Sequence, residues 1–310
     1  MIQEQNTFAG FPAGCLTDGD AADVVIIGIP YGVPYQADEI SPCYHAPDAI
    51  RAASNRYPED VISWDFDLHS TLLNDSAISV VDYGNLEGDT DDPGGNLVRG
   101  RDAVRTILKK DALPIVLGGD DSIPLMAFEA YEEMHNINIL QIDAHIDWRD
   151  EVGGQKKGFS STMRRASELN CVDRIIQVGA RGTGTARKQE LDAAIEYGSL
   201  IISGYDLHKN GVGQILDSLP SDKPCYLTID CDGLDPSIMP AVMSPIAGGV
   251  GYYQILDLIR GIHKKAGLAG LNVVEFVPHK DINSIGAVTA MRIIWNFIGE
   301  IAKQGKNPIT

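Results

Sequence analysis

The amino-acid sequence predicts an α/β fold in which a mainly parallel sheet lies between two layers of helices. Short apolar, β-branched segments recur along the chain, and amphipathic segments of helical length separate them. The apolar segments are continuous rather than alternating, as expected for strands that are covered on both faces. Strands that alternate with helices in this way are typical of a parallel sheet.

Eight segments have the length and composition of buried strands. They lie at residues 24–29, 77–81, 114–117, 137–142, 174–178, 200–202, 225–229 and 270–274. Helices are predicted at residues 96–109, 122–134, 186–197, 252–265 and 287–303. An acidic, turn-rich loop is expected at residues 84–95. The sequence contains no repeat, low-complexity tract or linker, so we expect a single domain over residues 1–310.

The composition excludes several classes of protein. The formal net charge of −18 argues against a nucleic-acid-binding face. The five cysteines form no CxxC pair, so we expect neither a zinc knuckle nor a disulfide framework, and we place Cys225 and Cys231 in the core. The N-terminus lacks the pattern of a signal peptide, and no window approaches about 20 consecutive apolar residues. We therefore expect a cytoplasmic protein that binds no membrane.

Acidic residues follow four of the predicted strands at their carboxyl ends, where functional groups collect in parallel sheets. Such charges are costly in an apolar setting unless they are paired or coordinated. The sequence thus predicts a polar site that several strands build together. Its candidate residues are Asp120 and Asp121, then Asp143, His145 and Asp147, then Asp230, Asp232 and Asp235, and finally Glu275.

Two of these motifs have the spacing of metal ligands. Asp143, His145 and Asp147 stand at i, i+2 and i+4, so an extended backbone would project all three to one face. Asp230 and Asp232 repeat the i, i+2 spacing. Oxygen and nitrogen donors of this kind, without thiolates, favour hard or borderline divalent metals. Two ions that share bridging carboxylates would need this many ligands.

A structural reading of these aspartates is also open. Aspartates after strands commonly cap helices or bind the amides of turns. That reading explains any single aspartate better than it explains both motifs in one chain. Asp235, which precedes Pro236, is the exception, and we expect it to stabilise its loop rather than to contact metal.

With these motifs the chain resembles the ureohydrolase family of arginase and agmatinase, as an agmatinase-like member. The resemblance covers most of the chain through VVIIGIPYG, LGGD, DAHID, QVGARG, DCDGLDP and VVEFVP, in this order. It implies a three-layer α/β/α sandwich with a mainly parallel sheet of about eight strands. It also implies a homotrimer or homohexamer and two divalent ions, Mn²⁺ foremost and Ni²⁺ as the other choice. The implied reaction cleaves a small guanidino compound to urea and an amine through a metal-bridging hydroxide.

The resemblance also implies which residues bind the two ions. Asp143 and Asp230 resemble ligands that bridge both ions. Asp147 resembles a ligand of the first ion, whereas His145 and Asp232 resemble ligands of the second. Together they imply a binuclear centre.

Two further roles concern the substrate. Glu275 resembles the carboxylate that receives the guanidinium in a charge-assisted hydrogen bond. Asp147 is expected to pass a proton to the departing nitrogen. Both residues are therefore expected to be catalytic.

Two positions depart from the family pattern. The family usually carries a histidine ligand where this chain has Asp121, which we expect to bind the first ion and, by its charge, to favour harder metals. The other possibility is that Asp121 swings away and leaves that site weak. Near Phe159 the family's proton-shuttling histidine is missing, and phenylalanine cannot transfer a proton. His279 could act instead, but we expect it in a surface loop.

The identity of the substrate is left in doubt. Residues 41–47, which shape the substrate pocket in the family, also differ from its pattern. Arg149, Arg164 and Arg165 could bind a substrate carboxylate or could equally lie at a subunit interface.

The leading hypothesis is an amidinohydrolase, a hydrolase of C–N bonds in linear amidines. The first alternative is a catalytically degenerate homologue that serves as a structural or regulatory subunit, which Asp121 and Phe159 suggest. The second is a deacetylase of acetylated polyamines that holds a single zinc with an Asp–His–Asp trio. Glu275, after its strand, favours the guanidine reaction instead.

Overall fold

The computed structural model describes residues 6–17, 22–35, 41–56, 58–132 and 134–304. Its strands are β1 (Val24–Ile29), β2 (Val80–Asn85), β3 (Leu113–Gly118), β4 (Ile137–Ile142), β5 (Val172–Ala180), β6 (Leu200–Ser203), β7 (Cys225–Asp230) and β8 (Leu268–Val274). They form one sheet in the order β2-β1-β3-β8-β7-β4-β5-β6, and all neighbouring strands in it are parallel.

Helices connect successive strands and cover both faces of this sheet. They are α1 (Ala46–Ser54), α2 (Pro93–Lys109), α3 (Ile123–Tyr131), α4 (Thr162–Ala166), α5 (Lys188–Tyr197), α6 (Gly204–Asn210), α7 (Gly213–Ser218), α8 (Tyr252–Lys265) and α9 (Ile285–Gln304). Short 3-10 turns are η1 (Phe8–Gly10), η2 (Pro58–Ile62), η3 (Phe159–Ser161), η4 (Cys231–Gly233) and η5 (Pro278–Lys280). The predicted three-layer α/β/α sandwich is confirmed.

Each strand contributes to two cores because successive side chains point to opposite faces. In β1, Val24 and Ile26 pack in the core that α1, α8 and α9 cover. Val25, Ile27 and Ile29 pack in the core that α2 and α3 cover. This double burial explains why the strands read as continuous apolar segments.

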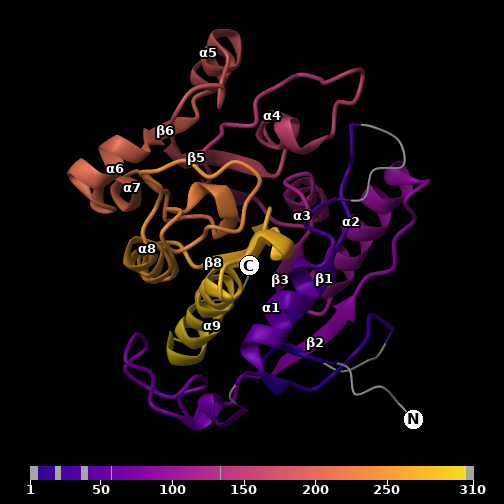
Figure 1. Cartoon of the computed structure of the whole chain (residues 1–310), viewed down its shortest axis with the longest axis vertical. Coiled ribbons are helices and arrows are strands. Elements are labelled where there is room, and N and C mark those ends of the chain that lie inside the picture. The colour runs from indigo at the N-terminus through magenta and orange to yellow at the C-terminus, as the bar shows by residue number, and fades with distance from the viewer. Residues whose placement is uncertain (1–5, 18–21, 36–40, 57, 133, 305–310) are drawn as a thin grey trace.

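α9 is long and apolar enough to cross a membrane by length and composition. Its apolar window is 72% buried inside the fold, however, as in the core helix of a globular protein. Figure 1 shows α9 lying between α1 and α8, which it contacts. The helix begins two residues before the predicted segment and ends one residue after it.

The predicted position of the second strand is wrong. β2 runs from Val80 to Asn85 rather than over residues 77–81. Asp82, which follows the predicted segment, lies inside β2 and pairs with Ile26 of β1. A buried aspartate in a strand contradicts the apolar pattern, and its ion pair with Arg51 of α1 makes it tolerable (2.8 Å).

Other boundaries differ by small amounts. α2 begins at Pro93, within the predicted acidic loop, because Asp92 caps it by accepting from the Gly95 N–H (2.8 Å). The short helices α4, α6 and α7 were not predicted, since segments of five to seven residues show little periodicity.

The acidic strand ends now have a place in the fold. The strands β3, β8, β7 and β4 are consecutive neighbours at the centre of the sheet. Because all of them are parallel, their carboxyl ends lie at one edge. The four acidic segments of the sequence therefore meet there.

Candidate metal centre

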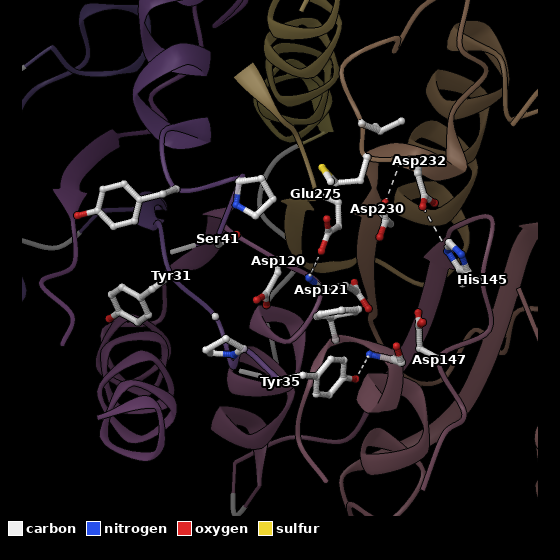
Figure 2. A pocket seen from close by; sticks show the side chains of 18 of the residues that line it. Tyr31, Tyr35, Ser41, Asp120, Asp121, His145, Asp147, Asp230, Asp232 and Glu275 are labelled. Atoms are coloured by element: carbon white, nitrogen blue, oxygen red, sulfur yellow. Dashed lines mark hydrogen bonds and ion pairs between the residues drawn. The ribbon is translucent and has the colours of Figure 1, made fainter. Parts of the chain in front are cut away.

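Two groups of potential metal ligands lie at this edge of the sheet. Within each group, the ligand atoms are no more than 4.8 Å from one another. One group contains Asp121, Asp143 and Asp230, and the other contains Asp143, His145 and Asp232. Asp143 belongs to both groups, so the two groups adjoin. Figure 2 shows the Asp232 carboxylate directed at the His145 ring.

The turn after β4 brings its motif together in an unexpected way. β4 ends at Ile142, and the backbone then leaves the extended conformation, so the expected alignment along a strand is wrong. The chain turns instead, and the His145 N–H donates to the Asp143 carboxylate (2.6 Å). Asp147 adopts a left-handed backbone with a φ of 48°. This backbone conformation is uncommon for a residue other than glycine and costs conformational energy.

The turn after β7 is held against the end of β4. Asp230 accepts a hydrogen bond from the Asp232 N–H (2.7 Å), and Asp232 accepts one from the Ala144 N–H (3.3 Å). A Cβ added to Gly233 would come within 2.5 Å of the Asp143 backbone nitrogen. Only glycine allows the two turns to approach so closely.

Asp121 fits a cation more directly than the other side chains. Its side chain is 3% exposed, and neither of its carboxylate oxygens has a hydrogen-bond partner. A buried carboxylate without partners is costly, whereas a bound cation would satisfy both oxygens. The donor set at this edge, rich in carboxylates and free of thiolates, fits two divalent ions.

Asp147 lies beside these groups rather than within either of them. Its Oδ2 accepts from the Gln141 side-chain amide (2.7 Å), and the same amide nitrogen donates to Asp143 (2.6 Å). The structure thus brings all six predicted metal-binding residues to one edge of the sheet, with Asp147 held through Gln141.

Glu275 follows β8 and lines the same pocket. Its two carboxylate oxygens accept from the Asp121 backbone N–H (3.0 Å) and from the Cys43 thiol (3.5 Å). Its own backbone is left-handed, with a φ of 59°. Two donors and an unusual backbone therefore hold this carboxylate in a single orientation.

The buried carboxylates of the site repel one another when they are ionised, so bound cations would stabilise them. Burial, and then the neighbouring carboxylates, raise the pKa of Asp121, Asp143 and Asp230 well above the usual range. Burial and the nearby Asp120 raise the pKa of Glu275 to about 8. Without metal, these groups therefore hold protons that divalent ions would displace.

His145 shows the opposite response to the same charges. Burial opposes its protonation, but the hydrogen bond and ion pair with Asp232 outweigh burial and raise the pKa of His145 to about 9. A metal needs the neutral imidazole, so binding would release this proton as well.

A pocket of about 510 Å³ opens onto the carboxylates. Aromatic side chains form much of its wall, and Phe159 packs on Tyr35 with ring centroids 4.5 Å apart. Figure 2 shows Tyr31 and His145 on opposite sides of the pocket with Glu275 between them. No Lys or Arg is among the described residues that line it, and the segment 36–40 contains neither.

The fold and this site can be compared with known proteins. The sequence profile of the Arginase family matches residues 22–299. The chain belongs to the arginase family. It is 26% identical over 295 residues to N(1)-aminopropylagmatine ureohydrolase from Thermococcus kodakarensis, which covers 94% of this chain and 95% of that protein.

Solved structures of the arginase family agree with this assignment. A hypothetical agmatinase from Burkholderia thailandensis superposes with a TM-score of 0.81 at 26% identity and covers 96% of this chain and 91% of its own. Proclavaminate amidino hydrolase from Streptomyces clavuligerus gives a TM-score of 0.80 at 25% identity, with 96% and 97% covered. The expected agmatinase-like ureohydrolase family and enzyme class, hydrolases of C–N bonds in amidines, are confirmed.

Membership of the arginase family implies a centre for two divalent ions, and the two ligand groups fit one. The position usually occupied by histidine holds Asp121, whose carboxylate stays in the ligand group rather than swinging away. Phe159 lines the pocket and is 38% exposed. Both departures from the family pattern therefore lie at the site itself.

Several other residues behave as their sequence context suggested. Asp235 binds its own loop, accepting from Ser237 (2.7 Å) and from the N–H groups of residues 248 and 249. His279 is exposed in η5. Cys225 and Cys231 are free and buried.

The three candidate arginines do not line the pocket. Arg149 pairs with a glutamate of α5 (3.6 Å), Arg164 pairs with Glu168 (3.7 Å), and Arg165 pairs with Asp150 (2.8 Å). These pairs leave none of them in contact with the pocket described here.

Sequence reasoning missed the residues that hold the ligands in place. Gln141 lies inside an apolar strand, and a buried amide there was a signal that could have been used. Cys43 gave no such signal, because its contact with Glu275 joins residues 232 positions apart.

Proposed function

We propose that this chain is a dinuclear-metal amidinohydrolase that cleaves a small, agmatine-like guanidino compound to urea and an amine. One observation carries the proposal. Two ligand groups share Asp143, and the carboxylate of Glu275 faces the same pocket. This arrangement allows a guanidinium to lie beside a metal centre.

The residues of the site have different proposed roles, and six of them would bind metal. Two divalent ions, when bound, supply the Lewis acidity that activates water near neutral pH. We propose that both ions would share Asp143 and Asp230. Asp121 and Asp147 would hold the first ion, and His145 and Asp232 would hold the second. We propose Mn²⁺ as the native metal, with Ni²⁺ as the other candidate, because carboxylates dominate the donor set.

Glu275 binds and orients the substrate. Its carboxylate accepts N–H groups of the planar guanidinium in a charge-assisted pair, which places the central carbon toward the ligand groups. Asp147 accepts a proton from the water that is consumed and delivers it to the amine nitrogen as the C–N bond breaks, since Phe159 cannot do so. The hydrogen bond from Gln141 keeps the Asp147 carboxylate beside Asp143 (2.7 Å).

The charge of the pocket favours a substrate without a carboxylate. With Asp143, the site holds seven carboxylates, whereas two divalent ions and a guanidinium supply five positive charges. The wall offers aromatic rings, which attract an ammonium group, and the described lining offers no Lys or Arg for an acid. Arg99 borders Tyr31 but is paired with Asp92 (3.3 Å).

We further propose that the protein is cytoplasmic and assembles into a homotrimer or homohexamer. Large apolar side chains are exposed at the end of η2 and just after it, namely Ile62, Trp64 and Phe66. Exposed apolar groups that lie together are typical of interaction surfaces.

The test is urea release from a panel of guanidino compounds after loading with Mn²⁺ or Ni²⁺. We expect metal-dependent urea from agmatine and less from 4-guanidinobutyrate. The matched control is Glu275→Gln, which keeps the shape but loses the charge. Breaking a buried charged pair costs about 2–5 kcal/mol, so kcat/KM should fall roughly 30-fold or more while metal content stays the same.

The other outcomes separate the rivals. If no guanidine is hydrolysed by the metal-loaded protein, the chain is a non-catalytic homologue. If it cleaves acetylated polyamines with zinc and releases no urea, it is a deacetylase. Unchanged kcat/KM in Glu275→Gln would remove the assigned role of that carboxylate.

A further inference from the structure

A side-chain amide lies between two of the proposed metal ligands. Gln141 is 0% exposed in the central strand β4. Its Nε2 donates to Asp143 Oδ2 (2.6 Å) and to Asp147 Oδ2 (2.7 Å). Both protons of this amide are thus used, and they hold two carboxylates of like charge close together.

A second buried amide fixes the first one. Gln177 of β5 is 1% exposed, and β5 pairs with β4 so that Gln177 lies directly beside Gln141. Its Nε2 donates to Gln141 Oε1 (2.6 Å) and to the Ile146 carbonyl (2.8 Å). Its Oε1 accepts from Trp148 Nε1 and from Ser199 Oγ, both at 2.9 Å.

The groups at the far end of this chain decide the orientation of both amides. The indole N–H of Trp148 can only donate, and the carbonyl of Ile146 can only accept. Gln177 must therefore direct its oxygen to Trp148 and its nitrogen to Gln141. Gln141 must in turn present its oxygen to Gln177 and its nitrogen to the carboxylates. If either amide were flipped, donors would face donors and acceptors would face acceptors, and these hydrogen bonds would be lost.

We propose that Gln141 and Gln177 form a relay of amides that positions Asp143 and Asp147 for metal binding and thereby sets metal affinity. The inference rests on the proposed metal centre. Gln141 brings the two carboxylates together without adding charge and occupies one oxygen of each. We assign the remaining oxygens, Oδ1 of Asp143 and Oδ1 of Asp147, to the ions, and Asp143 Oδ1 also accepts from the His145 N–H (2.6 Å). Gln177 is a positioning residue that acts through Gln141 and also holds the turn on either side of Asp147, at the Ile146 carbonyl and the Trp148 indole.

The effect of this relay can be measured as a change in metal affinity. Groups that orient metal ligands typically contribute about 10–100-fold to metal affinity. Without Gln141, Asp143 and Asp147 would lose the donor that they share, and their side chains would no longer be held together in the metal-free protein. Binding would then have to restore the ligand geometry at the expense of affinity.

The experiment measures Mn²⁺ dissociation constants by calorimetry on metal-free protein. Gln141→Met removes the amide that donates to both carboxylates. Gln177→Met removes the amide that holds Gln141 in its orientation. The matched control is Asn138→Met, because Asn138 is another fully buried amide of β4 and donates to the Lys223 carbonyl instead (3.0 Å). Thermal unfolding of the metal-free variants separates loss of fold from loss of binding.

We expect the dissociation constant to rise about 10–100-fold in Gln141→Met and by a smaller factor in Gln177→Met. The Asn138→Met control should bind as the wild type does. The double variant should lose less affinity than the product of the two single factors, since Gln177 can no longer act through Gln141 once Gln141 is gone. If Gln141→Met does not fold, Gln141→Asn, which retains a shorter amide, takes its place.

Two results would overturn the relay. One is Mn²⁺ affinity in Gln141→Met or Gln141→Asn within twofold of the wild type. The other is additive effects of the two substitutions. These outcomes are independent of urea release, so the relay can stand if no guanidine is cleaved. A wild-type protein that binds no Mn²⁺ would instead refute the metal centre itself.

Discussion

Asp121 and Glu275 are joined by a hydrogen bond from the backbone of one to the side chain of the other (3.0 Å). Asp121 can therefore present its free carboxylate to a metal while its amide orients the group that receives the substrate. Histidine at position 121 would keep the backbone N–H that binds Glu275 and would change only the side chain that is offered to the metal. The two functions of this residue can thus be tested separately.

We predict that Asp121→Ala lowers the bound metal from two ions per chain to one. A positioned Lewis acid contributes several kcal/mol to catalysis, so urea production should fall about 100-fold or more. Metal content is measured by mass spectrometry after gel filtration. Two tightly bound ions in this variant would show that Asp121 is not a ligand.

Asp121→His should keep both ions but change their preference. Exchanging a hard carboxylate for an imidazole favours nitrogen-binding metals, so the affinity for Ni²⁺ should rise relative to Mn²⁺. Competition titrations with both ions measure the ratio. An unchanged ratio would contradict the proposed effect of the extra carboxylate on metal choice.

At the scale of elements, one buried ion pair ties the first helix to the edge of the sheet. Arg51 of α1 donates to Asp82 of β2 through Nε (2.8 Å) and Nη2 (2.9 Å). Arg51 is 3% exposed and Asp82 is 0% exposed. Asp82 also accepts from the Phe8 N–H (2.8 Å), so the N-terminal segment is attached at the same point.

We predict that Asp82→Ala destabilises the fold by about 3–5 kcal/mol, because it removes the buried carboxylate that pairs with the Arg51 guanidinium. Urea denaturation, followed by circular dichroism, measures the loss. The double variant Arg51→Met with Asp82→Ala should recover part of it, since the buried Arg51 charge is then removed. An equal loss of unfolding free energy in the single and the double variant would mean that the buried Arg51 charge does not cause the destabilisation.

At the scale of the whole molecule, the acidic centre makes stability depend on metal and on pH. Raised carboxyl pKa values mean that the folded, metal-free protein binds more protons than the unfolded chain. The pKa of His145, raised to about 9, acts in the same direction. The pKa of Asp232 is lowered by its bond with His145, although burial opposes that shift, and it acts oppositely at acid pH.

We therefore predict that the metal-free protein loses stability as the pH rises from about 4.5, the range of free carboxyl groups, to about 8, where Glu275 titrates. Saturating Mn²⁺ should reverse this trend, because metal replaces the protons. Thermal unfolding in chelator and in Mn²⁺ measures both curves. A melting temperature in chelator that rises over this range would contradict the proton linkage. A single transition would also support the prediction of one domain over residues 1–310, which stays a prediction.

Local sequence determined much of this protein. Continuous apolar segments predicted the buried strands, since both faces of a parallel sheet are covered. The DAHID and DCDGLDP motifs indicated candidate metal ligands, and the order of the motifs along the chain indicated the family. These features are local, so they can be read without knowing what packs against what.

The tertiary structure decided the rest. The DAHID ligands meet through a turn with a left-handed Asp147 rather than along a strand, which spacing alone does not reveal. Asp82 lies in a strand because Arg51, 31 residues away, neutralises it. Gln141 and Cys43 support the ligands through contacts between distant elements. Such contacts depend on which strands become neighbours, and the order of strands in the sheet differs from their order in the chain.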